Sequence, residues 1–90
     1  MARPFNAPDV YRAVAHPVRR RVLELLQTRE RSPAELWAEF NIAMPTLSQH
    51  LKVLRMAELV TTTDRGKYRF YRLAAKRLAD IHTWSGRFAR

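Results

Sequence analysis

The sequence has no cysteine and only two glycines among its 90 residues. Without cysteine the chain forms no disulfide, holds no thiolate-bound metal and senses no oxidant through a thiol. Two glycines are too few for a glycine-rich phosphate loop. The three histidines are scattered, and none has a nucleophile partner at a recognisable spacing. The sequence therefore predicts a protein that is not an enzyme and uses no cofactor.

Long apolar runs are also missing. No stretch approaches the roughly 18–20 apolar residues that a membrane-spanning helix needs. No expected helix separates basic from bulky apolar side chains as binding to a membrane surface requires. Residues 1–6 are polar and interrupted by proline, unlike the apolar segment of a signal peptide. We therefore expect a cytoplasmic protein without a membrane partner.

Acidic residues are scarce. Eight Asp and Glu stand against seventeen Lys and Arg, which gives a net charge of +9 and a pI near 11.3. Residues 46–77 hold eight of the basic residues and only two of the acidic ones. Basic charge concentrated in one segment is the electrostatic footprint of a protein that binds a polyanion. The hydrophobic share of 47% is enough for the packed core of one domain over residues 1–90.

A first helix is expected over residues 10–15, capped by Asp9, and a second over residues 17–27. Pro17 separates them, because proline disfavours helical geometry at the residue before it and suits the first turn of a new helix. The arginines at positions 19–21 are either a solvated face or a clamp on DNA. The second helix is expected to bury Val18, Val22, Leu25 and Leu26.

The segment Ser-Pro-Ala-Glu at residues 32–35 is a strong signal for the start of a third helix. Serine caps the helix, proline occupies its first position and Glu35 closes a capping box. We expect this helix to run to Phe40 and to bury Leu36, Trp37 and Phe40. A large aromatic side chain at this spacing indicates core packing.

A fourth helix, over residues 45–57, has leucines at positions 47, 51 and 54. This spacing places the leucines on one buried face of the helix. Short polar side chains that can reach base edges, and cations that can reach phosphates, then lie on the remaining surface. Gln49 suits adenine. For His50, beside the buried Leu51, a packing or capping role is favoured and a DNA contact is the alternative. The predicted DNA contacts of this helix are Thr46, Ser48, Gln49, His50 and Lys52.

Two β-rich runs follow, over residues 59–63 and 68–73. Gly66 between them supplies the positive φ of a tight hairpin turn. Both faces of the second run mix apolar and charged side chains, which is typical of a wing with one end in the core and its tip in solvent. Such a wing contacts phosphates or the minor groove. Its predicted DNA contacts are Arg65, Lys67, Tyr68 and Arg69.

The last helix is expected over residues 74–88, beyond the compact helix-turn-helix unit. Its apolar side chains follow heptad-like spacing and need a surface to bury against. Another subunit is the natural partner, and the core of the same chain is the alternative. We therefore predict a homodimer that pairs through residues 9–15 and 74–88. The residues predicted for this interface are Val10, Leu78, Ile81, Trp84, Ser85 and Phe88.

Together these segments resemble the ArsR/SmtB family of small winged helix-turn-helix repressors. Residues 13–26 look like the first two helices of the family, residues 47–55 like its recognition helix and residues 59–73 like its wing. The resemblance implies a mainly helical fold with about five helices and a two-stranded wing. It also implies a homodimer that binds an inverted repeat in an operator and represses transcription.

Two features depart from the family pattern. Glu58 stands where the family commonly has the glycine that follows the recognition helix. Metal-sensing members place cysteines on the third helix, and this chain has none. Other members bind zinc through an Asp and a His on the last helix, together with a second His and another ligand. Asp80 and His82 match the first half of that spacing, but no histidine or acidic residue follows them. An Asp–His pair alone holds a metal poorly, so these two residues are weak metal candidates and an ordinary surface or interface pair is preferred.

We interpret the sequence as that of a sequence-specific DNA-binding transcriptional regulator. Its expected partner is double-stranded DNA, and the expected action is repression by a homodimer, including at its own promoter. One alternative is a nonspecific nucleoid-type DNA binder, which the charge of +9 favours. A second is a winged-helix module for protein interaction. The sequence leaves a small-molecule, metal or protein effector open.

Overall fold

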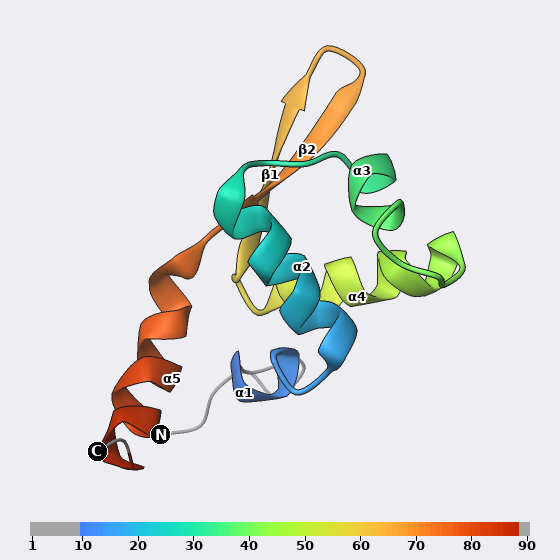
Figure 1. Cartoon of the computed structure of the whole chain (residues 1–90). Helices are drawn as coiled ribbons and strands as arrows, with labels where there is room; N and C mark the ends of the chain where they lie inside the picture. Colours follow the sequence, from blue (N-terminus) through green and yellow to red (C-terminus); the bar gives the residue numbers. More distant parts are fainter. Residues whose placement is uncertain (1–9, 89–90) are drawn as a thin grey trace.

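The computed structural model describes residues 10–88, which form five α-helices and one two-stranded antiparallel sheet (Figure 1). In chain order the elements are α1 (Val10–Ala13), α2 (Pro17–Thr28), α3 (Pro33–Trp37), α4 (Met44–Met56), β1 (Val60–Arg65), β2 (Tyr68–Leu73), the 3₁₀ turn η1 (Ala75–Arg77), α5 (Leu78–Ser85) and the 3₁₀ turn η2 (Gly86–Phe88). The arrangement confirms the predicted fold, which is mainly helical with a two-stranded wing.

The break between α1 and α2 follows from proline geometry. Pro17 requires extended backbone at His16, whose φ and ψ are −124° and 133°. The chain must leave the helix before that point, and α1 therefore ends at Ala13, earlier than predicted. His16 also caps α2, because its Nδ1 accepts a hydrogen bond from the backbone N–H of Val18 at 3.1 Å. The predicted cap of α1, Asp9, lies outside the described residues.

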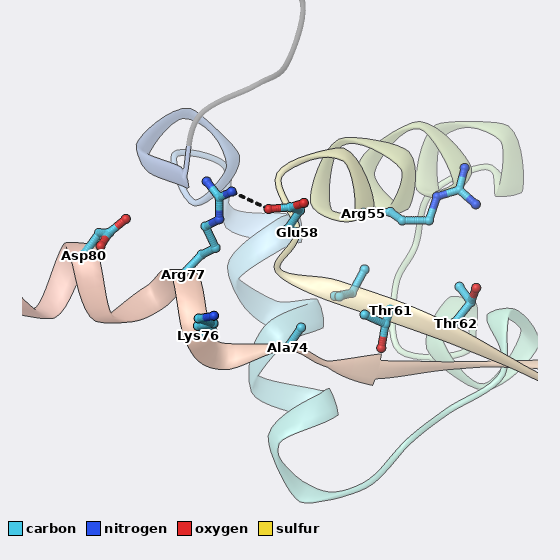
Figure 2. A pocket seen from close by; sticks show the side chains of 9 residues that line it. Arg55, Glu58, Thr61, Thr62, Ala74, Lys76, Arg77 and Asp80 are labelled. Carbon is cyan, nitrogen blue, oxygen red and sulfur yellow. Dashed lines mark ion pairs between the residues drawn. The ribbon is translucent and has the colours of Figure 1, made fainter. Parts of the chain in front are cut away.

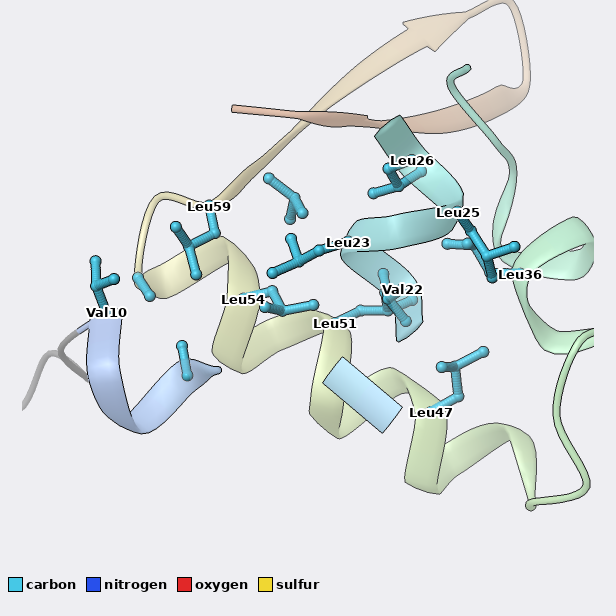
Figure 3. Close-up of a cluster of buried hydrophobic side chains, with 13 residues drawn as sticks. Val10, Val22, Leu23, Leu25, Leu26, Leu36, Leu47, Leu51, Leu54 and Leu59 are labelled. Atoms are coloured by element: carbon cyan, nitrogen blue, oxygen red, sulfur yellow. The ribbon is translucent and has the colours of Figure 1, made fainter. Parts of the chain in front are cut away.

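The core lies where α2 crosses α4 (Figure 3). Leu47 and Leu54 are fully buried and Leu51 is 2% exposed, which confirms the predicted leucine row. Burial of one leucine side chain stabilises a fold by about 1.5–3 kcal/mol. The buried cluster consists of Val10, Ala13, Val22, Leu23, Leu25, Leu26, Leu36, Leu47, Leu51, Leu54, Ala57, Leu59 and Val60. Burial of this cluster fixes which face of α4 points into the core and which face points outward.

α3 ends at Trp37, earlier than predicted, and the tryptophan lies at the surface. Trp37 is 43% exposed, so the prediction that it is buried is wrong. Its indole N–H donates a hydrogen bond to the carbonyl oxygen of Ile42 at 2.7 Å. Leu36 is fully buried and Phe40 is half-buried. The indole thus closes the connection between α3 and α4 through its polar edge.

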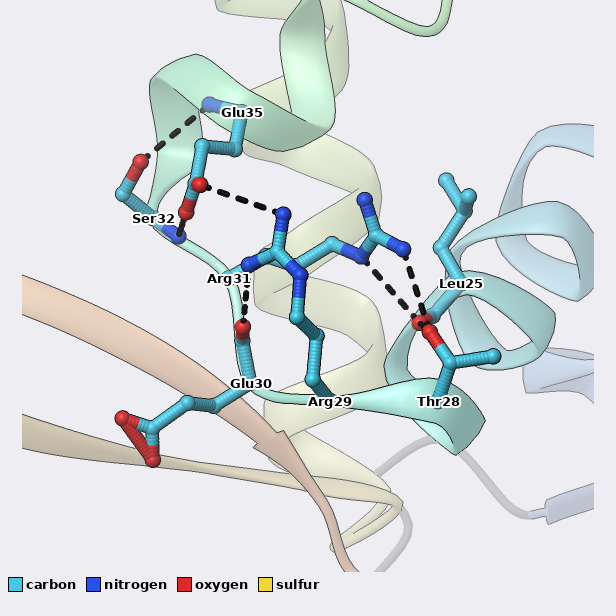
Figure 4. Close-up of polar contacts among 7 residues, drawn as sticks. All are labelled: Leu25, Thr28, Arg29, Glu30, Arg31, Ser32 and Glu35. Carbon is cyan, nitrogen blue, oxygen red and sulfur yellow. Dashed lines mark hydrogen bonds and ion pairs between the residues drawn. The ribbon is translucent and has the colours of Figure 1, made fainter.

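The connection between α2 and α3 holds both helices and the wing (Figure 4). Ser32 and Glu35 form the predicted capping box, with the Ser32 Oγ accepting from the Glu35 N–H at 3.2 Å and a Glu35 Oε1 accepting from the Ser32 N–H at 2.8 Å. The Arg31 Nε donates to the carbonyl of Leu25 near the end of α2 at 3.2 Å. The backbone of Arg31 also pairs with that of Tyr71 in β2, through bonds of 3.1 and 2.7 Å.

The hairpin is a wing with a buried base and a free tip. β1 and β2 pair from Val60 opposite Leu73 to Arg65 opposite Tyr68. Val60 is buried and Leu73 packs against the core, whereas Arg65 and Tyr68 are exposed. The turn residue Gly66 has the predicted positive φ of 63°. In Figure 1 the strands project away from the helices, with the tip at the end opposite α1 and α5.

The predicted last helix is α5 with a 3₁₀ turn on each side, and it divides its apolar residues between two environments. Leu78 and Ile81 pack against the core of their own chain. Trp84 is 50% and Phe88 69% exposed. The Trp84 ring lies 6.0 Å from that of Tyr11 in α1 and 5.2 Å from that of Phe88. We call these three exposed side chains the aromatic patch.

Glu58 occupies a position that favours glycine. Its φ is +63°, a left-handed conformation that costs a residue with a side chain about 1–2 kcal/mol. The Glu58 N–H donates to the Arg55 carbonyl and the Leu59 N–H to the Leu54 carbonyl, both at 3.0 Å. These two bonds are the pattern of a Schellman helix end. The departure from the family pattern therefore leaves the helix end in place and stores strain in it.

We expect Glu58→Gly to be more stable than Glu58→Ala by about 1 kcal/mol, because glycine adopts the left-handed conformation without strain. Both variants lose the same exposed ion pair with Arg77, so their difference isolates the backbone effect. Urea unfolding at one fixed protein concentration measures it. Equal stability of the two variants would contradict the strain.

Candidate nucleic-acid interface

The outward side of α4 carries a row of polar side chains. Thr46, Ser48, Gln49 and Lys52 are all exposed, opposite the buried leucines of the same helix. Among the described residues, none makes a hydrogen bond or ion pair with the side chains of Gln49 or Lys52. Both side chains are therefore available to an external ligand. The structure thus brings together four of the five residues predicted on this helix.

The fifth residue, His50, faces the protein. It is half-buried, and its ring centroid lies 4.3 Å from that of His16. The Nη1 of Arg19 is 3.4 Å from the His50 Nδ1. Burial, followed by the nearby His16 and Arg19, lowers the pKa of His50 below its ordinary value of 6.5. This geometry matches the favoured packing role of His50 and not the alternative of a DNA contact.

The arginine run of α2 has structural partners. The Arg19 Nε donates to the carbonyl of Ala13 at 2.8 Å, and the Arg20 Nη1 donates to that of Val14 at 2.9 Å. These carbonyls belong to the end of α1, where helix geometry leaves them without partners. Arg21 forms ion pairs with Glu24 and Glu39 at 3.4 and 3.7 Å. The run is therefore neither a purely solvated face nor a free clamp.

The predicted cations of the wing differ in whether an acidic side chain of the same chain pairs with them. Lys67 lies beside the turn, is exposed and has no ion-pair partner within residues 10–88. Arg69 donates from Nε to Asp64 at 3.1 Å, and this carboxylate raises the pKa of the Arg69 guanidinium. Arg65 forms an ion pair with Glu30. Tyr68 is 62% exposed at the end of β2.

Glu30 is the residue of this surface that sequence reasoning missed. It lies in the connection between α2 and α3, and its side chain is 23% exposed. Its carboxylate contacts Arg65, and the Nε of Arg72 lies 3.9 Å away. The residues in contact are far apart in the chain, so neither a spacing nor a motif in the sequence indicates them.

A groove of about 750 Å³ separates the end of α4 and β1 from α5 (Figure 2). Its lining consists of Arg55, Glu58, Val60, Thr61, Thr62, Ala74, Lys76, Arg77 and Asp80. The carboxylate of Glu58 pairs with Arg77, and both side chains are more than half exposed. Solvent screens such a pair, so it contributes little to stability. The groove therefore carries mixed, solvated charges and defines no ligand class.

The weak metal candidates lie on α5. Asp80 and His82 are both exposed, and the backbone carbonyl of Asp80 accepts a hydrogen bond from the Tyr11 hydroxyl at 3.3 Å. Within the described part of the chain, no group of three or more potential ligands surrounds a common point. Also within that part, no helix is long and apolar enough to cross a membrane.

Two helices joined by a short turn, with a polar row on the second and a basic hairpin behind it, define a winged helix-turn-helix protein. A family model described as a helix-turn-helix domain matches residues 14–63. The transcriptional repressor SdpR of Bacillus subtilis is 32% identical over 76 residues, which cover 84% of this chain and 84% of that protein. The chain belongs to the ArsR/SmtB family of winged helix-turn-helix regulators.

Two further relatives agree with this assignment. The HTH-type transcriptional repressor SmtB of Mycobacterium tuberculosis is 39% identical over 75 residues, which cover 83% of this chain but 56% of that protein. A crystal structure of a possible transcriptional regulator for arsenical resistance superposes with a TM-score of 0.77 at 38% identity, covering 86% of this chain and 80% of that one. This chain thus spans little more than half the length of the SmtB relative.

We predict that acidification weakens the fold through His50. Its lowered pKa means that, between the folded and the unfolded pKa, the unfolded chain binds more protons. Stability is therefore full above about pH 6.5 and falls as the pH drops through that window. His50→Gln should show a smaller loss of melting temperature between about pH 7.5 and 5.5 than the unaltered protein. The exposed His82→Gln is the control, and equal slopes for all three proteins would contradict the prediction.

Proposed function

We propose that this protein is a sequence-specific DNA-binding transcriptional repressor, with α4 as its recognition helix. The observation that carries the proposal is the exposed polar row on α4, opposite a fully buried leucine row. The repressor names of its relatives support it. In the major groove, Gln49 and Ser48 read base edges, while Lys52 and Lys67 contact phosphates.

A homodimer is part of the proposal. The aromatic patch joins α1 to α5 and leaves large apolar side chains in solvent. Pairing through this patch, together with the neighbouring faces of α5, would bury it. Val10 is left out of the proposed interface, because its side chain lies in the core of its own chain. In such a dimer the two α4 helices enter successive major grooves about 34–36 Å apart, which matches an inverted repeat.

Repression follows from occupancy of a promoter. A dimer bound across an operator blocks access of RNA polymerase, and the promoter of its own gene is the first candidate site. Binding there requires the compartment that holds the chromosome, so we propose a cytoplasmic location.

The proposal is tested by competition between the DNA upstream of its own coding region and a scrambled duplex. We expect a preference of about 10³ or more for the native sequence, and a steep loss of affinity for both duplexes between about 50 and 200 mM salt. If the operator is not in the DNA upstream of its own gene, selection of bound sequences from a pool of random duplexes identifies it. A pool with no enriched sequence would instead indicate a nonspecific nucleoid-type binder, and an absence of duplex binding would refute the proposal.

Gln49→Ala and Lys67→Ala are expected to separate the recognition of bases from the contacts with phosphates. The loss of Gln49 should reduce the preference for the operator, by about 1–3 kcal/mol for a bidentate contact with a base. The loss of Lys67 should weaken operator and scrambled duplex alike and lower the salt slope by about one. Titration of both duplexes with each variant measures these effects. An equal loss on both duplexes for Gln49→Ala would refute its reading role.

Trp84→Ala is expected to shift the protein towards the monomer, because it removes the centre of the aromatic patch. Trp37→Ala is the matched control, since Trp37 is also exposed but lies on α3. Sedimentation velocity over a range of protein concentrations measures the dissociation constant of the dimer. If both variants dimerise as the unaltered protein does, the interface lies elsewhere.

A further inference from the structure

The carboxylate of Glu30 contacts both terminal nitrogens of the Arg65 guanidinium. One terminal nitrogen of Arg65 contacts Oε2 of Glu30, and the other donates to Oε1. A hydrogen bond between two charged groups is about twice as strong as one between neutral groups, and here a second ion-pair contact lies beside it. Figure 4 shows the Glu30 side chain extending from the α2–α3 connection towards the strands of the wing. The pair therefore joins the helical body to the wing.

The surroundings strengthen this contact. The Oε2 atom of Glu30 has almost no solvent-accessible area and accepts no hydrogen bond, so its charge depends on the ion-pair contact with the guanidinium beside it. The guanidinium carbon of Arg65 also lies 5.1 Å from the centre of the Phe70 ring, a cation–π distance. One face and both terminal nitrogens of Arg65 thus make contacts within the chain, while 57% of the side chain stays exposed.

Lys67 offers the contrast on the same wing. It is exposed beside the turn and makes no ion pair with the residues that the structure describes. A phosphate can approach its ammonium group without breaking an internal contact. A phosphate that approaches Arg65 meets a guanidinium whose charge is already paired with Glu30, and a two-point contact with the same pair of terminal nitrogens requires it to displace that carboxylate.

We propose that Glu30 withholds Arg65 from DNA and so acts as an internal competitor of the phosphate backbone. Glu30 is a positioning residue, since it acts through Arg65, and its effect is to keep the affinity of the wing for any duplex below what its charge would provide. This inference rests on the proposed function. It also revises the predicted role of Arg65, which becomes a brace of the wing instead of a phosphate contact. If Glu30 instead oriented Arg65 towards DNA, its removal would weaken binding.

The test compares Glu30→Gln with Glu24→Gln on one duplex over a range of salt concentrations. Each substitution removes one negative charge, and Glu24 lies on α2 in an exposed pair with Arg21, so it controls for net charge. We expect Glu30→Gln to tighten binding by about 3–10-fold at about 0.15 M salt and to steepen the salt slope by about 0.9, the value of one added phosphate contact. Glu24→Gln should change affinity by less than about 2-fold, because an exposed charge at a distance is screened.

A second comparison removes each wing cation in turn, first with Glu30 present and then without it. Arg65→Gln should cost much less affinity than Lys67→Gln in the unaltered background, because Arg65 is already engaged. In the Glu30→Gln background the cost of Arg65→Gln should rise to match that of Lys67→Gln. Circular dichroism confirms that each variant is folded, and the comparison of the two single wing variants stands even where Glu30→Gln does not fold.

The outcomes separate this inference from the proposed function. Tighter binding and a steeper salt slope for Glu30→Gln alone support the competitor role. If the unaltered protein binds duplex DNA and Glu30→Gln binds no more tightly than Glu24→Gln, the inference is overturned and the proposed function stands. A loss for Arg65→Gln as large as that for Lys67→Gln in the unaltered background also overturns it. If the unaltered protein binds no duplex, the proposed function fails and the inference fails with it.

Discussion

The packing of the leucine row of α4 on α2 is the constraint on which the rest of the surface depends. Leu47, Leu51 and Leu54 are buried almost completely, and a helix cannot rotate such a row into water without losing several kcal/mol. Because successive helical residues are set about 100° apart, burial of these three positions turns Ser48 and Gln49 outward. The polar row that reads DNA in the proposed function is therefore a geometric consequence of the core.

Contacts from the α2–α3 connection hold the wing in place beside the helices. The backbone of Arg31 pairs with Tyr71 in β2, and the side chain of Glu30 reaches Arg65 near the tip. A two-stranded hairpin alone is marginally stable in water. The same short connection also carries the capping box of α3. One segment thus contacts both the start of α3 and the strands of the wing.

The two ends of the described chain meet on the other side of the molecule. Leu78 and Ile81 anchor α5 to the core, while Trp84 extends past it to Tyr11 of α1. Isolated surface aromatics are ordinary, but three that are linked through Trp84 form a patch that suits an interface. Glu58 and Arg77 link the end of α4 to the segment that leads into α5.

The amino-acid sequence by itself determined the helical phase of α4, the capping box at Ser32 and the turn at Gly66. Each of these depends on residues within one or two turns of chain, where periodicity and backbone preference act directly. Tertiary structure alone decided that Trp37 is exposed, that Val10 lies in the core and that Glu30 engages Arg65. The core position of Val10 and the pairing of Glu30 with Arg65 depend on side chains that are distant in sequence and meet only after folding. The exposure of Trp37 depends on how the α3–α4 connection returns to its indole, which the helical spacing of apolar residues does not indicate.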